Sequence, residues 1–122
     1  MTFIEVVENL PAHVVNKSTD FSGITLRHVV AGDLMSDVLV TDYEDLLIVT
    51  SLATEQTLRT ADMIGARGIL LVNDKLPQRA MKDLAEEQDI TLLSTPLTMF
   101  EACISLGFLL GLSGPLKTEA MV

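Results

Sequence analysis

The chain has 122 residues, and 48% of them are hydrophobic, which is enough to bury one core without disulfides or metals. Its formal net charge is −9, with 17 acidic residues against 8 scattered basic ones, which argues against nucleic acid as a partner. The longest apolar stretch, residues 102–112, falls short of the ~18 residues of a membrane span. One cysteine and a start unlike a secretory signal predict a cytoplasmic protein.

The amino-terminal part predicts one short helix and two strands. Thr2 and Glu5 form a capping-box pattern, in which each side chain satisfies a free amide at a helix start. This helix is expected to stop near Pro11. Residues 13–15 and 24–30 are strand candidates on either side of a polar, turn-like segment.

Three short apolar runs, residues 46–49, 68–72 and 91–94, predict three further strands, each followed by turn residues and a helical pattern. They recur about every 22 residues, a spacing that suits right-handed crossovers between parallel strands. We therefore predict a single α/β domain with an open, largely parallel sheet flanked by helices. It should span residues 1–112, and residues 113–122 should form a mobile tail.

Capping residues mark the three helices of this half. Thr54 is expected to cap the first, and Gly65 to end it in the left-handed conformation. Pro77 suits the first turn of the second, and Thr98 opens a capping box for a helix that runs to about residue 110. The side chains expected to face the core from the first two helices are Leu58, Ala61, Ile64, Ala80, Met81, Leu84 and Ala85.

The loops that follow the three apolar strands are candidates for a ligand site, because open parallel sheets bind ligands beyond the carboxyl ends of their strands. Two of the loops are rich in hydroxyls beside helix amides, which suits a phosphate, a carboxylate or the polar edge of a nucleotide. In a plainer alternative, these residues are only caps and turn formers. The candidates from these loops are Thr50, Ser51, Thr54, Asn73, Ser94, Thr95 and Thr98.

A second candidate group lies in residues 31–38. Asp33 and Asp37 have the spacing that places two carboxylates on one face of a helical turn, where they are able to bind hydrated Mg²⁺ or a ligand's amine. Ser36 belongs to the same group. The alternative is that Asp33 caps a short helix and Asp37 is solvated. No third ligand such as a nearby histidine accompanies them, so no metal site is assigned.

No catalytic residues and no cofactor are predicted. His13 and His28 lie in strand-like segments away from the polar loops, and Cys103 lies on an apolar helix without a basic neighbour in sequence. The glycines of residues 65–68 follow a helix and precede a strand, which is the reverse of a phosphate-binding loop. We therefore expect a protein that is not an enzyme.

The final predicted helix has almost no polar face, so we expect it to be covered on more than one side. A sheet in so small a domain covers only part of it, which favours a partner surface at Phe100, Ile104 and Phe108. A second copy of the chain is the first expectation. Packing between the sheet and the amino-terminal elements is the alternative.

Several strings resemble the small stand-alone DRTGG-domain proteins. They are residues 32–39, residues 47–50 before 56–61, and residues 92–95 before 98–103, in the same order. Such domains are similar to regulatory modules of CBS-containing pyrophosphatases and long phosphotransacetylases, and are related to the amino-terminal domain of HPr kinase/phosphorylase. The Asp-Arg-Thr-Gly-Gly signature itself is absent, and the strand that often ends in Thr-Gly-Gly in relatives ends here in residues 71–74, Leu-Val-Asn-Asp. A pocket shaped by those residues in relatives would therefore differ here or be lost.

The resemblance implies regulation by a ligand or partner, and homodimers, without catalysis by the domain. The resulting hypothesis is a non-catalytic, homodimeric regulatory domain that binds a small anionic metabolite or nucleotide. The alternative is an interaction module that docks onto a larger metabolic or signalling enzyme through its apolar carboxyl-terminal helix.

Overall fold

The computed structural model describes residues 1–112, 114 and 115. Strands and helices alternate through most of this region, as the recurring apolar runs predict. The elements are α1 (Phe3–Asn9), β1 (His13–Asn16), β2 (His28–Ala31), α2 (Met35–Leu39), β3 (Leu46–Thr50), α3 (Glu55–Ile64), β4 (Gly68–Leu71), α4 (Arg79–Gln88), β5 (Thr91–Ser94) and α5 (Met99–Leu109).

The strands form one five-stranded sheet in the order β1-β5-β4-β3-β2. β2, β3, β4 and β5 run parallel, and β1 is antiparallel to β5 at one edge. Every residue of β3, β4 and β5 is buried, because helices cover both faces of the sheet. The predicted fold, a single α/β domain with a largely parallel sheet flanked by helices, is confirmed.

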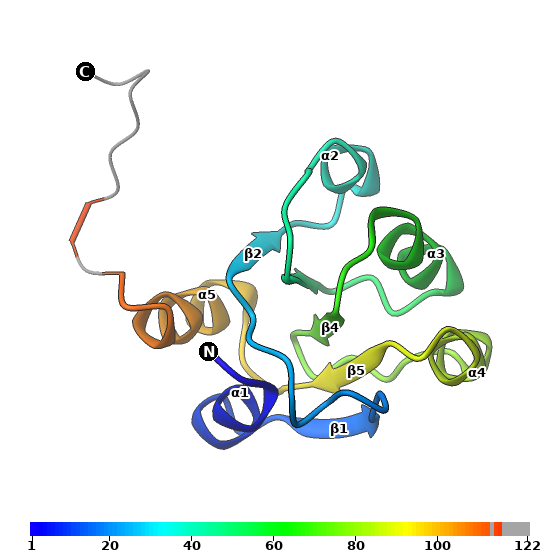
Figure 1. The fold of residues 1–122 in the computed structure, drawn as a ribbon, viewed down its shortest axis with the longest axis horizontal. Coiled ribbons are helices and arrows are strands. Elements are labelled where there is room, and N and C mark those ends of the chain that lie inside the picture. The colour runs from blue at the N-terminus through cyan, green and yellow to red at the C-terminus, as the bar shows by residue number, and fades with distance from the viewer. Residues whose placement is uncertain (113, 116–122) are drawn as a thin grey trace.

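The helices form two layers, as Figure 1 shows: α1 and α5 lie on one side of the sheet, and α2, α3 and α4 on the other. Each crossover from β2 through to β5 moves one strand along the sheet in the same direction, so right-handed connections place all three of their helices on one face. Two buried clusters result. The first joins α1 and α5 to one face of the sheet, and the second joins α2, α3 and α4 to the other.

The amino-terminal helix is joined to the core by an aromatic contact. Phe3 is fully buried and stacks on Phe21, with ring centroids 5.3 Å apart. Its ring also lies over Gly68: a Cβ built there would come within 2.7 Å of two ring carbons and 3.1 Å of the Thr91 carbonyl oxygen. The Phe3 ring therefore fits here only because residue 68 is a glycine and has no side chain.

The predicted helix termini are mostly confirmed. The capping boxes at Thr2 and Thr98 both form, and Gly65 ends α3 with φ of 72°. Thr54 occupies the N-cap position of α3, but its side chain makes no capping hydrogen bond. Pro77 precedes the N-cap of α4 and is not in its first turn, which corrects the prediction.

Three further sequence predictions need correction. The strand expected over residues 24–30 is β2, which begins only at His28, although Ile24 and Leu26 are buried as expected. Ala80 is exposed, so the core stripe of α4 consists of Met81 and Ala85, with Leu84 partly buried. Asp33 does not cap α2, whose N-cap is Leu34 without a side-chain bond.

The mobile tail predicted for residues 113–122 lies outside the described residues, apart from Gly114 and Pro115. Within the part of the chain that is described, no helix is long and apolar enough to cross a membrane.

Candidate functional site

The carboxyl ends of β2 to β5 meet at one edge of the sheet, because these strands are parallel; we call this the carboxyl edge. Backbone hydrogen bonds join its loops. The Asn73 amide donates to the Leu97 carbonyl at 2.7 Å, and the Asp74 amide to the Thr95 carbonyl at 3.0 Å. The Gln78 amide donates to the Ala53 carbonyl at 3.0 Å. The three loops predicted to converge therefore do so.

Asp33 is the centre of a hydrogen-bonded cluster at this edge. Its Oδ1 accepts hydrogen bonds from the Thr50 hydroxyl at 2.8 Å and from the Ser51 amide at 2.7 Å. Its Oδ2 accepts one from the Ser51 hydroxyl at 2.6 Å. The loop after β2 is thereby fastened to the end of β3. A carboxylate has about four acceptor positions, so one remains on Oδ2 of this exposed residue.

The hydrogen bonds at Asp33 also favour its charged form. The Ser51 hydroxyl has the largest effect in holding the pKa of the Asp33 carboxyl below its ordinary value of 3.8, and the Ser51 amide and the Thr50 hydroxyl add to it. The Lys75 ammonium lowers the pKa further by charge attraction, against a partial opposing effect of burial. Lys75 is exposed and follows β4, so a cation lies at the same edge of the sheet as this carboxylate.

Lys75 was not among the predicted site residues. A usable signal was present, because Lys75 is the only basic residue in the three loops that follow β3, β4 and β5.

Ser94 and Thr95 are buried and serve the fold at this edge. The Ser94 hydroxyl donates to the Lys75 carbonyl at 3.1 Å and so fixes the backbone of that loop. The Thr95 hydroxyl donates to the Leu10 carbonyl and accepts from the Leu97 amide. Both hydroxyls thus have protein partners, and their contribution to a ligand site is to hold the loops in place.

The amino termini of the helices differ in how far they are capped. At α5, the Thr98 hydroxyl accepts from the Glu101 amide while the Glu101 carboxylate accepts from the Thr98 amide, so two free amides are satisfied. Thr54 gives α3 no such bond. On the first turn of α3, Thr57 is fully buried, and its hydroxyl has no hydrogen-bond partner in the described part of the chain. A buried hydroxyl of this kind calls for a water or a ligand.

Ser36 and Asp37 do not join the Asp33 cluster. Both are exposed residues of α2, whereas Asp33 lies before its N-cap. Because Asp33 is outside the helix, the prediction that Asp33 and Asp37 share one face of a helical turn is wrong. Across residues 1–112, 114 and 115, no group of three or more His, Cys, Asp or Glu side chains is placed to hold a metal ion.

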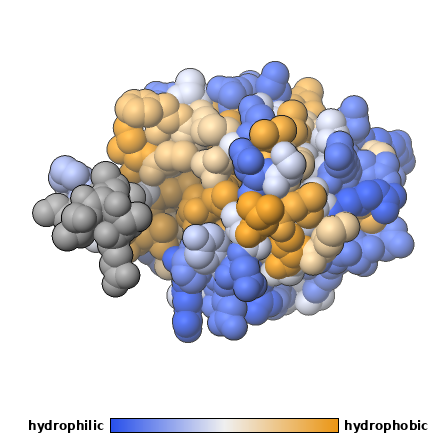
Figure 2. Space-filling view, turned by 90° about the horizontal axis from the view of Figure 1, so that it is seen from above, coloured by the Kyte–Doolittle hydropathy of each residue, from blue (hydrophilic) through white to orange (hydrophobic). Residues whose placement is uncertain are grey.

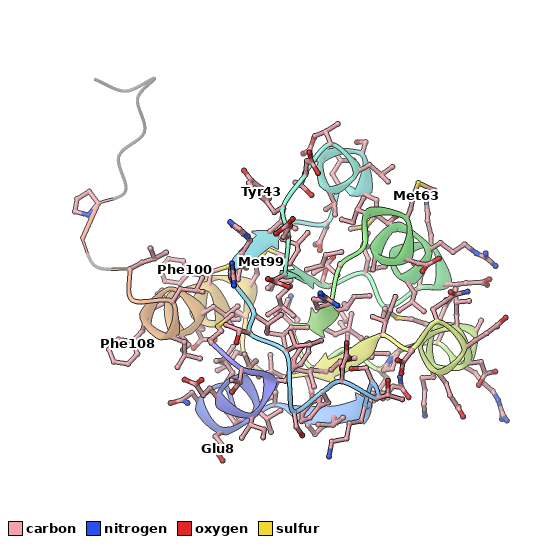
Figure 3. All side chains as sticks on the ribbon, in the orientation of Figure 1. Glu8, Tyr43, Met63, Met99, Phe100 and Phe108 are labelled. Atoms are coloured by element: carbon pink, nitrogen blue, oxygen red, sulfur yellow. The ribbon has the colours of Figure 1, made fainter. Side chains whose placement is uncertain are left out.

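The outer face of α5 carries large exposed side chains: Phe100 is 74% exposed, Ile104 58% and Phe108 79%. Figure 3 shows the Phe108 ring projecting away from the sheet, and Figure 2 shows hydrophobic residues gathered on the side of the molecule that carries α5. The alternative, in which the sheet and amino-terminal elements enclose this helix, is wrong for this face. Further exposed apolar residues, which the sequence did not single out, lie at and around α2: Leu34, Leu39, Val40 and Tyr43.

The hydrogen bonds to Asp33 predict a pH dependence. Because the pKa of Asp33 is lower in the folded chain, its stabilising contribution is fully present above the unfolded value and is lost as the pH falls through the folded value. A carboxyl-carbon NMR titration should therefore give a pKa below 3.8, and Ser51→Ala should raise it. Asp33→Asn should remove this part of the acid dependence of unfolding. A wild-type Asp33 pKa at or above 3.8 would contradict the hydrogen-bonding account.

Comparisons with known proteins place the fold. No family model matches the chain, and no curated protein matches it. Among solved structures, it is similar to the CBS and DRTGG domains of the regulatory region of Clostridium perfringens pyrophosphatase, a crystal structure in complex with the activator diadenosine tetraphosphate. The TM-score is 0.68 at 15% identity; the match covers 86% of this chain but 45% of the other, so this chain spans less than half of that length. The chain is thus related in fold to the regulatory region of an enzyme, and membership of the DRTGG family stays a prediction.

Proposed function

We propose that this chain is a non-catalytic regulatory domain that binds a nucleotide, or a similar small anionic metabolite, at the carboxyl edge. The observation that carries the proposal is the meeting of the loops after β2, β3 and β4 at one edge of the sheet, which places the hydrogen-bonded Asp33 cluster and Lys75 at the same edge. The free acceptor position of Asp33 suits a ribose hydroxyl, and the Lys75 ammonium suits a phosphate. A nucleotide carries both of these groups, the ribose hydroxyls and the phosphate, on one molecule.

Two further features support a ligand here. The fold is related to a regulatory region whose crystal structure contains a nucleotide activator. The first turn of α3, which follows the Ser51 loop, has no side-chain cap, so its backbone amides are available to an anionic group. Asn73, Ser94 and Thr95 hold the neighbouring loops in position by the bonds described above.

The chemistry of the site argues for binding and against catalysis. Ser51 has a carboxylate partner in Asp33, which is the arrangement of a nucleophile and a base. A general base works best with a pKa near the working pH, however, and the pKa of Asp33 is lowered below 3.8. Asp33 is therefore poorly suited to accept the Ser51 proton.

A thermal-shift screen tests the proposal. The purified protein is scanned with ATP, ADP, AMP, nicotinamide cofactors, acyl-CoA and small carboxylates, with and without Mg²⁺. A nucleotide present at about 100 times its dissociation constant should stabilise the fold by about 2.7 kcal/mol, which is a shift of several degrees in a domain of this size. We expect the adenine nucleotides to give the largest response.

Variants localise the response. Lys75→Gln and Ser51→Ala should reduce the nucleotide-induced shift, because each removes a group from the carboxyl edge. Arg67→Gln is the matched control, since it removes the same charge at the opposite end of β4. An equal loss in Lys75→Gln and Arg67→Gln would show general charge attraction in place of a site, and a flat panel would remove the ligand-binding role.

The same proposal assigns the outer face of α5 to a homodimer interface. Phe100, Ile104 and Phe108 follow one another at intervals of one helical turn and leave an apolar strip in a chain of net charge −9. Because this strip carries no charge, two copies are able to approach there without bringing like charges together. The second candidate function uses the same strip to dock onto a larger enzyme, and the oligomeric state decides between them.

A further inference from the structure

A second hollow lies on the α5 side of the sheet, away from the carboxyl edge. It has a volume of about 350 Å³ and lies between α5 and the beginning of β2, which is an edge strand of the sheet. It is lined by Arg27, His28, Val29, Cys103, Leu106, Gly107, Leu110 and Leu112. Its size is at the lower end of that of small-molecule sites.

The walls of this hollow are mainly apolar. Val29, Leu106 and Leu110 supply aliphatic surface, and Cys103 is half-buried with a thiol whose pKa is raised by burial. The space beside Gly107 is open, because a Cβ built on it would meet nothing within 4 Å. An alkyl chain is therefore the complementary occupant of these walls.

One basic residue, Arg27, lines the hollow, on a chain that has only 8 basic residues against 17 acidic ones. The Arg27 side chain is 66% exposed, and its Nε lies 3.3 Å from Asp45 Oδ2. Arg67 pairs with the other oxygen of Asp45 at 3.3 Å and with Asp20 at 3.8 Å. A guanidinium group has five donors, so Arg27 keeps donors for a further anion beside its pair with Asp45.

His28 beside it is held in place. Its Nδ1 lies 2.7 Å from the Glu44 carbonyl oxygen, and its ring stacks on Tyr43 with centroids 4.9 Å apart. The ring is therefore held against the segment that precedes β3, and the residue itself lines the hollow next to Arg27 in the chain.

We infer that this hollow binds a free medium-chain carboxylate, with the alkyl chain against the α5 wall and the carboxylate on Arg27. The inference does not depend on the nucleotide site, which is at the other end of β2. An anionic lipid surface is the alternative source of apolar chains and negative charge, and the test separates it from free carboxylates.

The test is calorimetric titration of the whole protein with hexanoate, octanoate and decanoate below their micelle concentrations. Affinity should rise with chain length by up to about fourfold for each buried CH₂. Decanol should bind at least 10-fold more weakly than decanoate, and Arg27→Gln should weaken decanoate by a similar factor. Lys82→Gln is the control, since it removes one charge from α4 on the opposite face of the sheet.

Gly107→Leu should fill the hollow and abolish decanoate binding, while Gly107→Ala should retain most of it. If Gly107→Leu does not fold, protection of Cys103 from a maleimide reagent by decanoate replaces that arm, with decanol as its comparison. Equal binding of decanoate and decanol, or decanoate binding that survives both Gly107→Leu and Arg27→Gln, would overturn the inference. Binding only to anionic vesicles, without binding to free decanoate, would overturn it as well.

Discussion

Phe3→Ala is expected to lower the free energy of unfolding by about 3–5 kcal/mol, a large part of the total stability of a small domain. The ring is fully buried, stacks on Phe21 and fills the space above Gly68, so its removal leaves a cavity between α1 and the sheet. Urea denaturation followed by circular dichroism measures the change. Phe100→Ala is the matched control: its ring is 74% exposed, and in the monomer it should change stability by less than about 0.5 kcal/mol.

A double-mutant cycle with Gly68 shows whether the contact itself is correct. Gly68→Ala alone should cost about 1–3 kcal/mol, because the new Cβ would lie 2.7 Å from the Phe3 ring. In the Phe3→Ala background the same substitution should cost at least about 1 kcal/mol less, with the contact to the Thr91 carbonyl remaining. Strictly additive effects would mean that α1 does not pack over Gly68 in solution.

Ile104→Glu is expected to weaken the homodimer at least 100-fold, because burying an unpaired carboxylate in each half of an apolar interface costs several kcal/mol. The monomer should be little affected, since Ile104 is 58% exposed on α5. Sedimentation velocity over a concentration series measures the association. Met63→Glu, at a residue 74% exposed on α3, introduces the same charge away from this face and should leave the dimer intact.

The possible results separate the two uses of α5. A wild-type chain that stays monomeric at 100 µM would refute the homodimer and leave docking onto another protein as the use of the face. A wild-type dimer that Ile104→Glu does not dissociate would place the dimer interface elsewhere on the molecule. Neither result touches the nucleotide proposal, which is measured separately.

Much of the fold follows from local patterns in the sequence. The three apolar runs identify β3, β4 and β5 because strands covered on both faces need apolar residues throughout. The capping boxes at Thr2 and Thr98 are local hydrogen-bonding motifs, and both form as predicted. Gly65 ends α3 because the position needs a positive φ.

The errors arise where distant parts of the chain decide the conformation. Leu26 is buried without being in a strand, since its amide donates to the Met1 carbonyl. The Arg27 and His28 amides both donate to the Asp45 carbonyl, so β2 pairs with β3 only from His28. Alternating hydropathy reports burial, and it does not report which neighbour accepts a backbone hydrogen bond.

The sequence predicts which loops meet at the candidate site, but it does not predict the contacts that the individual residues make there. Parallel strands bring the loops to one edge, which fold reasoning anticipates. Sequence spacing linked Asp33 to Asp37, whereas Asp33 bonds to Ser51, 18 residues away. The burial of Ser94 and the position of Lys75 at the same edge as Asp33 likewise depend on tertiary structure.

The most direct test of the central claim is an amide NMR titration of the ¹⁵N-labelled protein with ATP, repeated with ADP and AMP. We expect saturable shifts that are largest at Ser51, Lys75 and the residues beside them. These shifts should be lost in Lys75→Gln and retained in Arg67→Gln. Saturable shifts confined to the opposite edge, around Arg67 and Asp20, or no saturable shift with any of the three nucleotides, would contradict it.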